Sequence, residues 1–184
     1  MQLLLSVIYT VLLAITMVSF SPPVQSSDID NTLLIDLEYG EVVIKMRPDL
    51  APKHVARIKE LVRQKFYDGL TFHRVIGGFM AQGGDPNGNG TGGSGTKIPA
   101  EFSNEPHVRG TVSMARSSDP NSGDSQFFIV FKRSNWLDGQ YTVWGKVIKG
   151  MEFVGKLKRG SRANNGLVDE PDRMLRVRLA ADVK

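Results

Sequence analysis

The stretch that decides the fold is Thr71–Pro86, which reads TFHRVIGGFMAQGGDP. It contains two short apolar runs, 72–76 and 79–82. Gly77-Gly78 joins the two runs and Gly83-Gly84 follows the second, a pattern typical of strands with tight turns. The stretch therefore predicts two strands at the centre of the chain.

Side chains alternate between the two faces of a strand, which places Phe72, Arg74 and Ile76 on one face of the first run. On the second run Met80 and Gln82 share a face, and the Gln82 amide can both donate and accept hydrogen bonds. A single cation thus stands among apolar neighbours. Taken alone, this pattern fits an ordinary sheet face with one exposed arginine as well as it fits a binding surface.

The remainder of the chain predicts a mainly β fold. Two segments have apolar residues at helical spacing, 52–64 and 151–158, and Pro52 suits the first position of a helix. No strand–helix–strand rhythm is present, so we expect a closed or nearly closed antiparallel barrel with two helices. Runs rich in β-branched and aromatic residues predict the other strands at 32–37, 41–46, 110–116, 125–131, 141–148 and 175–179.

Residues 86–96, PNGNGTGGSGT, are too rich in glycine for regular structure. Their G-x-G-x-x-G spacing is not followed by a helix, so a dinucleotide site lacks its context. A calcium loop starting at Asp85 would need an acid where Thr96 stands. We expect a long surface loop whose glycines allow close backbone approach.

The N-terminus resembles a targeting segment. Residues 1–27 carry no charge, and 3–20 is mostly apolar. The small residues before position 27 suit a cleavage site, so we expect a signal peptide at 1–26 and one folded domain at 27–184. An N-terminal anchor is the alternative, because the apolar run approaches the roughly 20 residues of a membrane span. The chain has no cysteine, so an exported domain would rely on its core without disulfides.

The formal net charge of +4 invites a nucleic-acid hypothesis. However, the basic residues are scattered and broken by acids, which favours a solvated basic surface.

Common catalytic patterns find little support in the sequence. The G-x-S frame at 123–125 continues with Gln126, which does not fit a nucleophile elbow. A zinc site would require His54, His73 and His107 to converge from distant segments. His54, in the first turn of the first helix, is expected at the surface or near the helix cap.

Six motifs, in order, closely resemble the cyclophilins, the peptidyl-prolyl cis-trans isomerases. The similarity covers almost everything from Leu33 to the C-terminus. The motifs are FHRVI at 72–76, GFMAQGGD at 78–85, NGTGG at 89–93, SMA at 113–115, SQFFI at 125–129 and WLDG at 136–139.

The resemblance implies an eight-stranded antiparallel barrel with a helix at each end and a proline-binding groove on its outer surface. It implies that Arg74 is the catalytic arginine. For the proline ring it implies a pocket of Phe79, Met80, Phe128 and Leu137. The groove positions it implies are Gln82, Gly90, Ala115, Arg116, Ser117, Gln126, Trp136 and Tyr141, with Trp136 also associated with cyclosporin binding.

Three positions depart from the family pattern. Gly77 stands where many relatives have proline, which loosens the turn before Phe79. Arg116 replaces a common asparagine and adds a charge beside the groove. Tyr141 replaces a histidine found in many eukaryotic members, which puts inhibitor affinity and substrate preference in question.

The leading hypothesis is an exported prolyl isomerase that assists protein folding, with the periplasm as its expected compartment. Such an enzyme breaks no bond, so an arginine donor over an apolar pocket suffices without cofactor or metal. The expected partners are Pro-containing polypeptides and cyclosporin-like cyclic peptides, with no nucleic acid, a monomeric state, and membrane contact only through a retained leader. The alternatives are a non-catalytic cyclophilin-like module that holds Pro-containing segments, and a basic nucleic-acid-associated protein.

Overall fold

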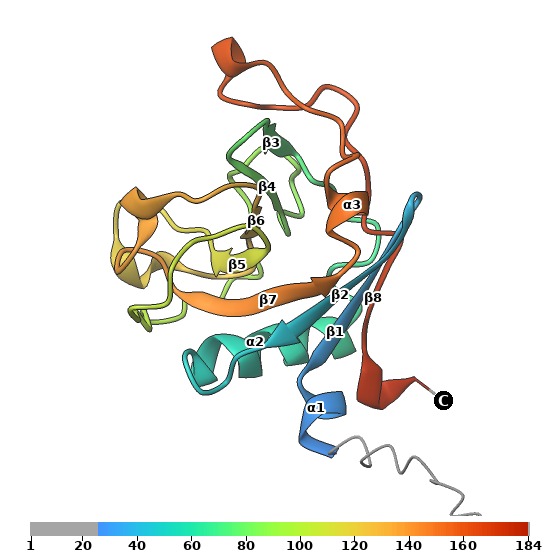
Figure 1. Cartoon of the computed structure of the whole chain (residues 1–184), viewed down its shortest axis with the longest axis vertical. Helices are drawn as coiled ribbons and strands as arrows, with labels where there is room; N and C mark the ends of the chain where they lie inside the picture. Colours follow the sequence, from blue (N-terminus) through green and yellow to red (C-terminus); the bar gives the residue numbers. More distant parts are fainter. Residues whose placement is uncertain (1–25, 184) are drawn as a thin grey trace, which may run out of the picture.

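The computed structural model describes residues 26–183 and contains eight antiparallel strands that curl around one core (Figure 1). The predicted signal peptide lies almost entirely outside these residues. The strands are β1 (Thr32–Leu37), β2 (Gly40–Met46), β3 (Arg74–Ile76), β4 (Met80–Gly83), β5 (Thr111–Met114), β6 (Phe127–Val130), β7 (Val143–Lys149) and β8 (Arg176–Leu179). The helices are α1 (Ser26–Asp30), α2 (Pro52–Arg63) and α3 (Met151–Val154), with 3₁₀ turns at Pro120–Ser122, Asn135–Leu137, Arg162–Asn164 and Ala180–Asp182.

The sheet has the order β3-β4-β6-β5-β7-β2-β1-β8, so every predicted strand is present and the mainly β prediction is confirmed. The two edge strands, β3 and β8, do not form a ladder with each other. Instead the segments beside them meet: Gly69 donates to the Met174 carbonyl at 2.7 Å, and Met174 donates to the Leu70 carbonyl at 2.8 Å. These bonds close the curled sheet where regular pairing ends.

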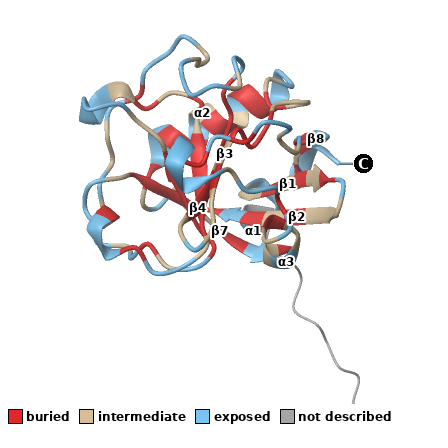
Figure 2. Ribbon diagram, turned by 90° about the horizontal axis from the view of Figure 1, so that it is seen from above, coloured by how far each residue is buried: buried red, intermediate tan, exposed pale blue. Residues whose placement is uncertain are grey.

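The alternation of side chains divides the sheet into an inner and an outer apolar face. Ala81, Phe127 and Ile129 point into the main core, which also contains Trp144. Their sequence neighbours Met80, Phe128 and Val130 form a second cluster with Leu137 on the other face. Buried residues follow the central strands and α2, whereas the outer loops are largely exposed (Figure 2). The second cluster becomes the floor of the candidate site.

Helix α2 packs against β7 and β8, and α3 lies beside β2 (Figure 1). The prediction for α3 was too long, because from Lys156 onward the hydrogen bonds tighten to i→i+3, as in Lys156 N–H to the Phe153 carbonyl. The short α1 begins at Ser26, the last residue of the expected leader, and its other four residues belong to the expected folded domain. Among residues 26–183, no helix has the length and apolar character needed to cross a bilayer.

The predicted face of Phe72 was wrong. Strand β3 begins only at Arg74, so the alternation does not extend back to Phe72. The Phe72 ring is buried in the main core and packs edge-on against Phe127, with 6.3 Å between ring centroids.

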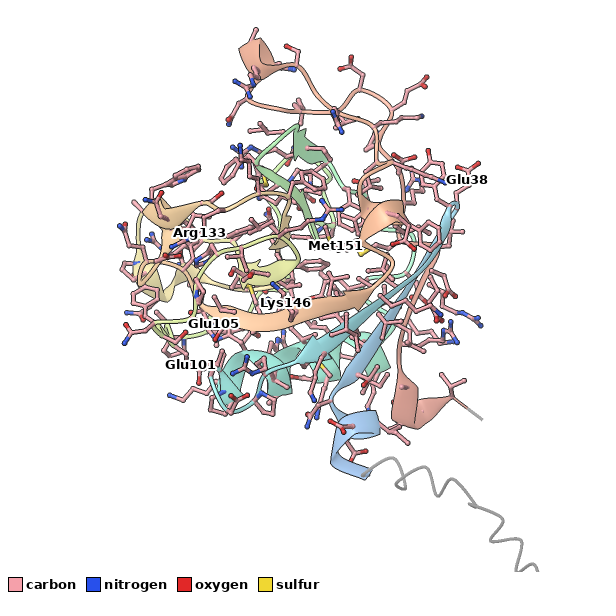
Figure 3. All side chains as sticks on the ribbon, in the orientation of Figure 1. Glu38, Glu101, Glu105, Arg133, Lys146 and Met151 are labelled. Carbon is pink, nitrogen blue, oxygen red and sulfur yellow. The ribbon has the colours of Figure 1, made fainter. Side chains whose placement is uncertain are left out.

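The sequence predicts His54 at the surface or near the helix cap; it lies in the capped first turn of α2, but it is buried rather than at the surface. Its ring is 1% exposed, and Nδ1 lies 2.6 Å from a Glu101 carboxylate oxygen. The same carboxylate accepts the backbone N–H groups of Lys53 and His54 at 3.0 Å, so it caps α2, whose N-cap residue Ala51 forms no side-chain bond (Figure 3). Glu101 is 47 residues away in the sequence but in direct contact with the first turn of α2, where it covers His54.

Candidate active site

The register of three neighbouring strands aligns the candidate residues. Arg74 on β3 pairs with Gln82 on β4, and Gln82 pairs with Phe128 on β6. A 3₁₀ turn then carries Leu137 to the same face, where it is buried against Phe128. Two strand pairings and one turn are thus enough to place a cation next to an apolar floor.

An apolar pocket of about 100 Å³ lies on this face. Met80, Phe128 and Leu137 in its wall are each at most 5% exposed. Nine of the predicted site residues line it, and none of the nine is histidine, aspartate or glutamate: Arg74, Phe79, Met80, Gln82, Ala115, Arg116, Phe128, Leu137 and Tyr141. A small ring that enters the pocket therefore meets the apolar side chains of Met80, Phe128 and Leu137, while Arg74, Gln82 and Arg116 supply the polar part of the lining.

A chain of side-chain hydrogen bonds fixes the Arg74 guanidinium. Nη1 donates to Gln82 Oε1 at 3.0 Å, and Gln82 Nε2 donates to Gln126 Oε1 at 2.9 Å. Gln126 Nε2 then donates to the carbonyls of Gly90 and Gly92. A guanidinium can only donate, so the direction of every bond in the chain is determined.

Asn165 supplies the other two acceptors of Arg74. The Nε–H bonds to the Asn165 carbonyl and Nη2 to Asn165 Oδ1, both at 2.9 Å. Asn165 adopts a left-handed conformation with φ of 51°, which asparagine tolerates better than most residues. Sequence reasoning missed this residue. The Asn165-Gly166 dipeptide, with its preference for turns, was the one available signal.

Burial lowers the pKa of Arg74 from its ordinary value, while the nearby Tyr141 acts in the opposite direction. A guanidinium nevertheless stays protonated throughout the physiological range. Arg74 is therefore a fixed donor of hydrogen bonds and cannot serve as a proton shuttle.

A buried Ser–His–Asp arrangement supports the pocket from behind. His107 Nε2 lies 2.9 Å from Ser113 Oγ, and its Nδ1 lies 3.0 Å from Asp138 Oδ1. The imidazole stacks on the Phe128 ring at 6.2 Å. His107 and Ser113 are both fully buried, so the serine is inaccessible as a nucleophile and the group acts as a backing for Phe128.

A second cavity of about 390 Å³, here called the side groove, adjoins the apolar pocket. Gln82, Ala115 and Arg116 line both cavities. The predicted residues Gly90, Ser117 and Gln126 lie in the side groove and do not line the pocket. Trp136 lies at the rim, 59% exposed, with its ring 5.6 Å from that of Phe79.

Two carboxylates, Asp85 and Asp124, hold the glycine-rich loop that borders the side groove, and Asp124 accepts the N–H groups of Ser94 and Gly95. Asp85, 1% exposed, accepts the N–H groups of Asn87, Asn89 and Gly90. A side chain at Gly92 would collide with the Asp85 carboxylate. The close approach expected for these glycines is therefore an approach to the protein's own carboxylates.

The three histidines do not converge. His54 and His107 bond to Glu101 and Asp138, respectively, and burial lowers the pKa of all three, most directly by removing the charged form from water. Within residues 26–183, no group of three histidine, aspartate or glutamate residues is placed to hold a metal ion.

An antiparallel β barrel with an arginine beside a small pocket on its outer face is the arrangement that the sequence motifs predicted, and the comparison with known proteins identifies the class of enzyme. Residues 32–179 match the family model described as cyclophilin type peptidyl-prolyl cis-trans isomerase/CLD. The chain therefore belongs to the cyclophilin-type peptidyl-prolyl cis-trans isomerases and is an enzyme of that type.

Individual relatives carry the same description. The protein named "Probable peptidyl-prolyl cis-trans isomerase" of Brucella suis biovar 1 is 54% identical over 171 residues, covering 86% of this chain and 87% of its own. Peptidyl-prolyl cis-trans isomerase B of Bacillus subtilis is 46% identical over 127 residues, covering 67% of this chain and 88% of its own.

Solved structures share the fold. Cyclophilin AquaCyp293 from Hirschia baltica superposes with a TM-score of 0.76 at 29% identity, covering 85% of this chain and 76% of that one. A cyclophilin-type peptidyl-prolyl cis-trans isomerase of Cryptosporidium parvum, crystallised in the presence of the dipeptide Ala-Pro, superposes with a TM-score of 0.72 at 29% identity. The match covers 80% of this chain and 98% of that one.

Proposed function

We propose that this isomerase seats the proline ring of its substrate in the apolar pocket and stabilises the twisted peptide bond with Arg74. The juxtaposition of the fixed guanidinium with the pocket is the observation that supports this mechanism. During rotation the amide loses resonance and its nitrogen regains a lone pair. A donor already oriented toward that position stabilises the twisted state without transferring a proton.

The magnitudes are consistent with this role. The barrier to rotation is about 18–20 kcal/mol. An acceleration on the order of 10⁵ requires lowering it by about 7 kcal/mol. One preorganised donor in a water-poor site supplies about 3–4 kcal/mol. The apolar wall of Met80, Phe128 and Leu137 contributes the remainder by removing water from the polar ground state and holding the ring.

The competing hypothesis is a module that binds Pro-containing segments without isomerising them. NMR exchange spectroscopy on a peptide with one proline separates the two. The isomerase produces exchange peaks between the cis and trans forms at catalytic concentrations of protein. A binding module shifts or broadens the peaks without exchange between them, and that result would overturn the proposal.

We further propose that the enzyme assists the folding of exported proteins, as the uncharged and apolar residues 3–20 suggest. N-terminal sequencing of the protein recovered from the cell exterior or periplasm should find a new terminus close to residue 27. Recovery of the intact chain in the membrane fraction would favour the anchor, and recovery in the cytosol would contradict export.

A further inference from the structure

Arg116 occupies the point at which three cavities meet. It lines the apolar pocket, the side groove, and a third hollow on the far side of Arg74 that Asn165 also borders. A peptide whose proline fills the apolar pocket and whose neighbouring residues enter either adjoining cavity therefore passes beside Arg116. Arg116 and Tyr141, both departures from the family pattern, contact each other here.

The Arg116 guanidinium is held in place by carbonyl oxygens. Nε donates to the Gln140 carbonyl at 3.1 Å and Nη1 to the Ser117 carbonyl at 2.8 Å. The guanidinium carbon lies 4.7 Å from the centre of the Tyr141 ring, within the range of a cation–π contact. These contacts fix the orientation of the guanidinium.

None of these contacts neutralises the charge. Among the described residues, no carboxylate forms an ion pair with Arg116. Arg116 differs in this respect from Arg133, whose guanidinium pairs with Asp138. A half-buried cation with fixed orientation and no acidic partner favours a ligand that brings its own negative charge.

The side groove holds one further cation and one carboxylate besides Arg116. Lys97 and Asp124 line it together with Arg116. The Asp124 carboxylate already accepts the N–H groups of Ser94 and Gly95, at 2.9 and 3.0 Å. These bonds leave the negative charge of Asp124 in place, but the two cations Lys97 and Arg116 outnumber the one carboxylate among the residues that line the groove, so it presents a net positive charge to a bound peptide.

We propose that Arg116 is a specificity-determining residue that makes this isomerase prefer prolines with an acidic side chain within two residues. The inference rests on the proposed seating of proline in the apolar pocket. A carboxylate beside the proline reaches a cation that is already oriented, whereas a lysine there is repelled by Arg116 and Lys97.

The test compares short peptides that contain one proline and differ only in a neighbouring glutamate, glutamine or lysine. The wild-type enzyme is expected to have kcat/KM about two- to fivefold higher for glutamate than for glutamine, the size typical of a partly exposed ion pair. The value for lysine should be lower still. Raising the salt concentration should reduce the difference, because screening weakens exposed charge pairs.

Variants assign the preference to one residue. Arg116→Gln is expected to bring the glutamate-to-glutamine ratio to about one, while Arg116→Lys retains part of it. Lys149→Gln is the matched control, because it removes one positive charge at an exposed position on β7 outside all three cavities. This control should keep the wild-type ratio.

Two results would overturn the proposal: a wild-type enzyme that does not distinguish glutamate from glutamine, or an Arg116→Gln variant that keeps the distinction. Calorimetry should also measure the dissociation constants of the same peptides. Binding tests the role of Arg116 without depending on turnover, so the failure of this proposal can be distinguished from the failure of the proposed mechanism. A glutamate preference in binding that disappears in Arg116→Gln supports the role of Arg116 even where turnover contradicts the mechanism. Equal binding of all three peptides contradicts that role whatever the turnover.

Discussion

Arg74 has three acceptors, and two of them belong to Asn165, a residue 91 positions later in the chain. Gln82 supplies the third. A long arginine side chain loses much rotamer freedom when it is fixed, and these bonds establish that orientation before substrate arrives. Asn165 is thus a positioning residue in the proposed mechanism.

Replacing Asn165 with glycine isolates the side-chain part of this contact. Glycine accepts the left-handed backbone and keeps the carbonyl that receives Nε–H, so only the Oδ1 acceptor is lost. We expect kcat to fall about three- to tenfold with little change in KM, because a partly exposed bond to a charged group is removed. Steady-state kinetics with one prolyl peptide measures both constants.

Asn164→Ala is the control, since Asn164 lies in the same turn and its side chain makes no bond to Arg74. Asn165→Asp keeps an oxygen acceptor and should restore most of kcat. Wild-type kcat in Asn165→Gly would exclude a positioning role.

At this scale the sequence predicted the residues that lie in local motifs. Arg74, Met80 and Gln82 belong to one continuous stretch, and strand alternation is enough to bring Met80 and Gln82 to one face. Asn165 could not be predicted in the same way. Its contact depends partly on a backbone carbonyl and on the path of a loop between α3 and β8, which no local periodicity encodes.

At the scale of elements, the glycine-rich loop after β4 is held by the side chain of Asp85. Burial by itself would raise the pKa of Asp85, but the backbone N–H groups of Asn87, Gly90 and Asn89 outweigh it and hold that pKa below its usual range. The carboxylate therefore stabilises the loop in its ionised form.

Asp85→Ala should reduce the free energy of unfolding by about 2–3 kcal/mol, because three partly buried hydrogen bonds to one buried carboxylate are lost. It should also raise KM, since Gly90 would no longer be held where Gln126 bonds to its carbonyl. Urea denaturation and peptide kinetics measure the two effects.

Asp119→Ala provides the comparison, because the exposed Asp119 caps only the Asn121 N–H. We expect Asp119→Ala to reduce the free energy of unfolding by less than about 1 kcal/mol and to leave KM unchanged. Equal stability losses in the two variants would contradict the role given to Asp85.

The sequence predicted the strands better than the helix ends and loops. The hairpin of β1 and β2 and the helix α2 follow clear periodicities, and both formed where expected. The burial of His54 was missed because Glu101, 47 residues away, caps α2. Contacts of this kind are decided by the closing of the barrel and leave no trace in a local pattern.

For the whole molecule, stability and catalysis should depend differently on pH. Burial holds the pKa values of His54, His73 and His107 below their usual value of about 6.5. As pH falls through 6.5 the unfolded chain takes up protons first, so the free energy of unfolding decreases. The lowered pKa values of Glu101 and Asp85 add a further loss of stability as pH falls below their ordinary values of 4.5 and 3.8, respectively.

Catalysis should not follow this curve between about pH 5.5 and 9, as long as the enzyme stays folded. The residues that line the apolar pocket include no histidine or carboxylate, so kcat/KM should stay within about twofold across that range. Chemical denaturation and peptide kinetics at matched pH values measure the two profiles. A bell-shaped kcat/KM profile centred near pH 7 would indicate a titrating catalytic group and contradict the mechanism.

The most direct test of the central claim is kcat/KM of Arg74→Ala with one prolyl peptide, measured beside the wild type and Arg74→Lys. We expect kcat/KM of Arg74→Ala to be about 100- to 1,000-fold lower than that of the wild type, which is the usual effect of removing one preorganised donor. The melting temperature should be unchanged. The kcat/KM of Arg74→Lys should lie between those of the wild type and Arg74→Ala. An ammonium keeps the charge but lacks the planar guanidinium group that bonds to Gln82 and Asn165. A folded Arg74→Ala variant with kcat/KM within threefold of the wild type would contradict the mechanism.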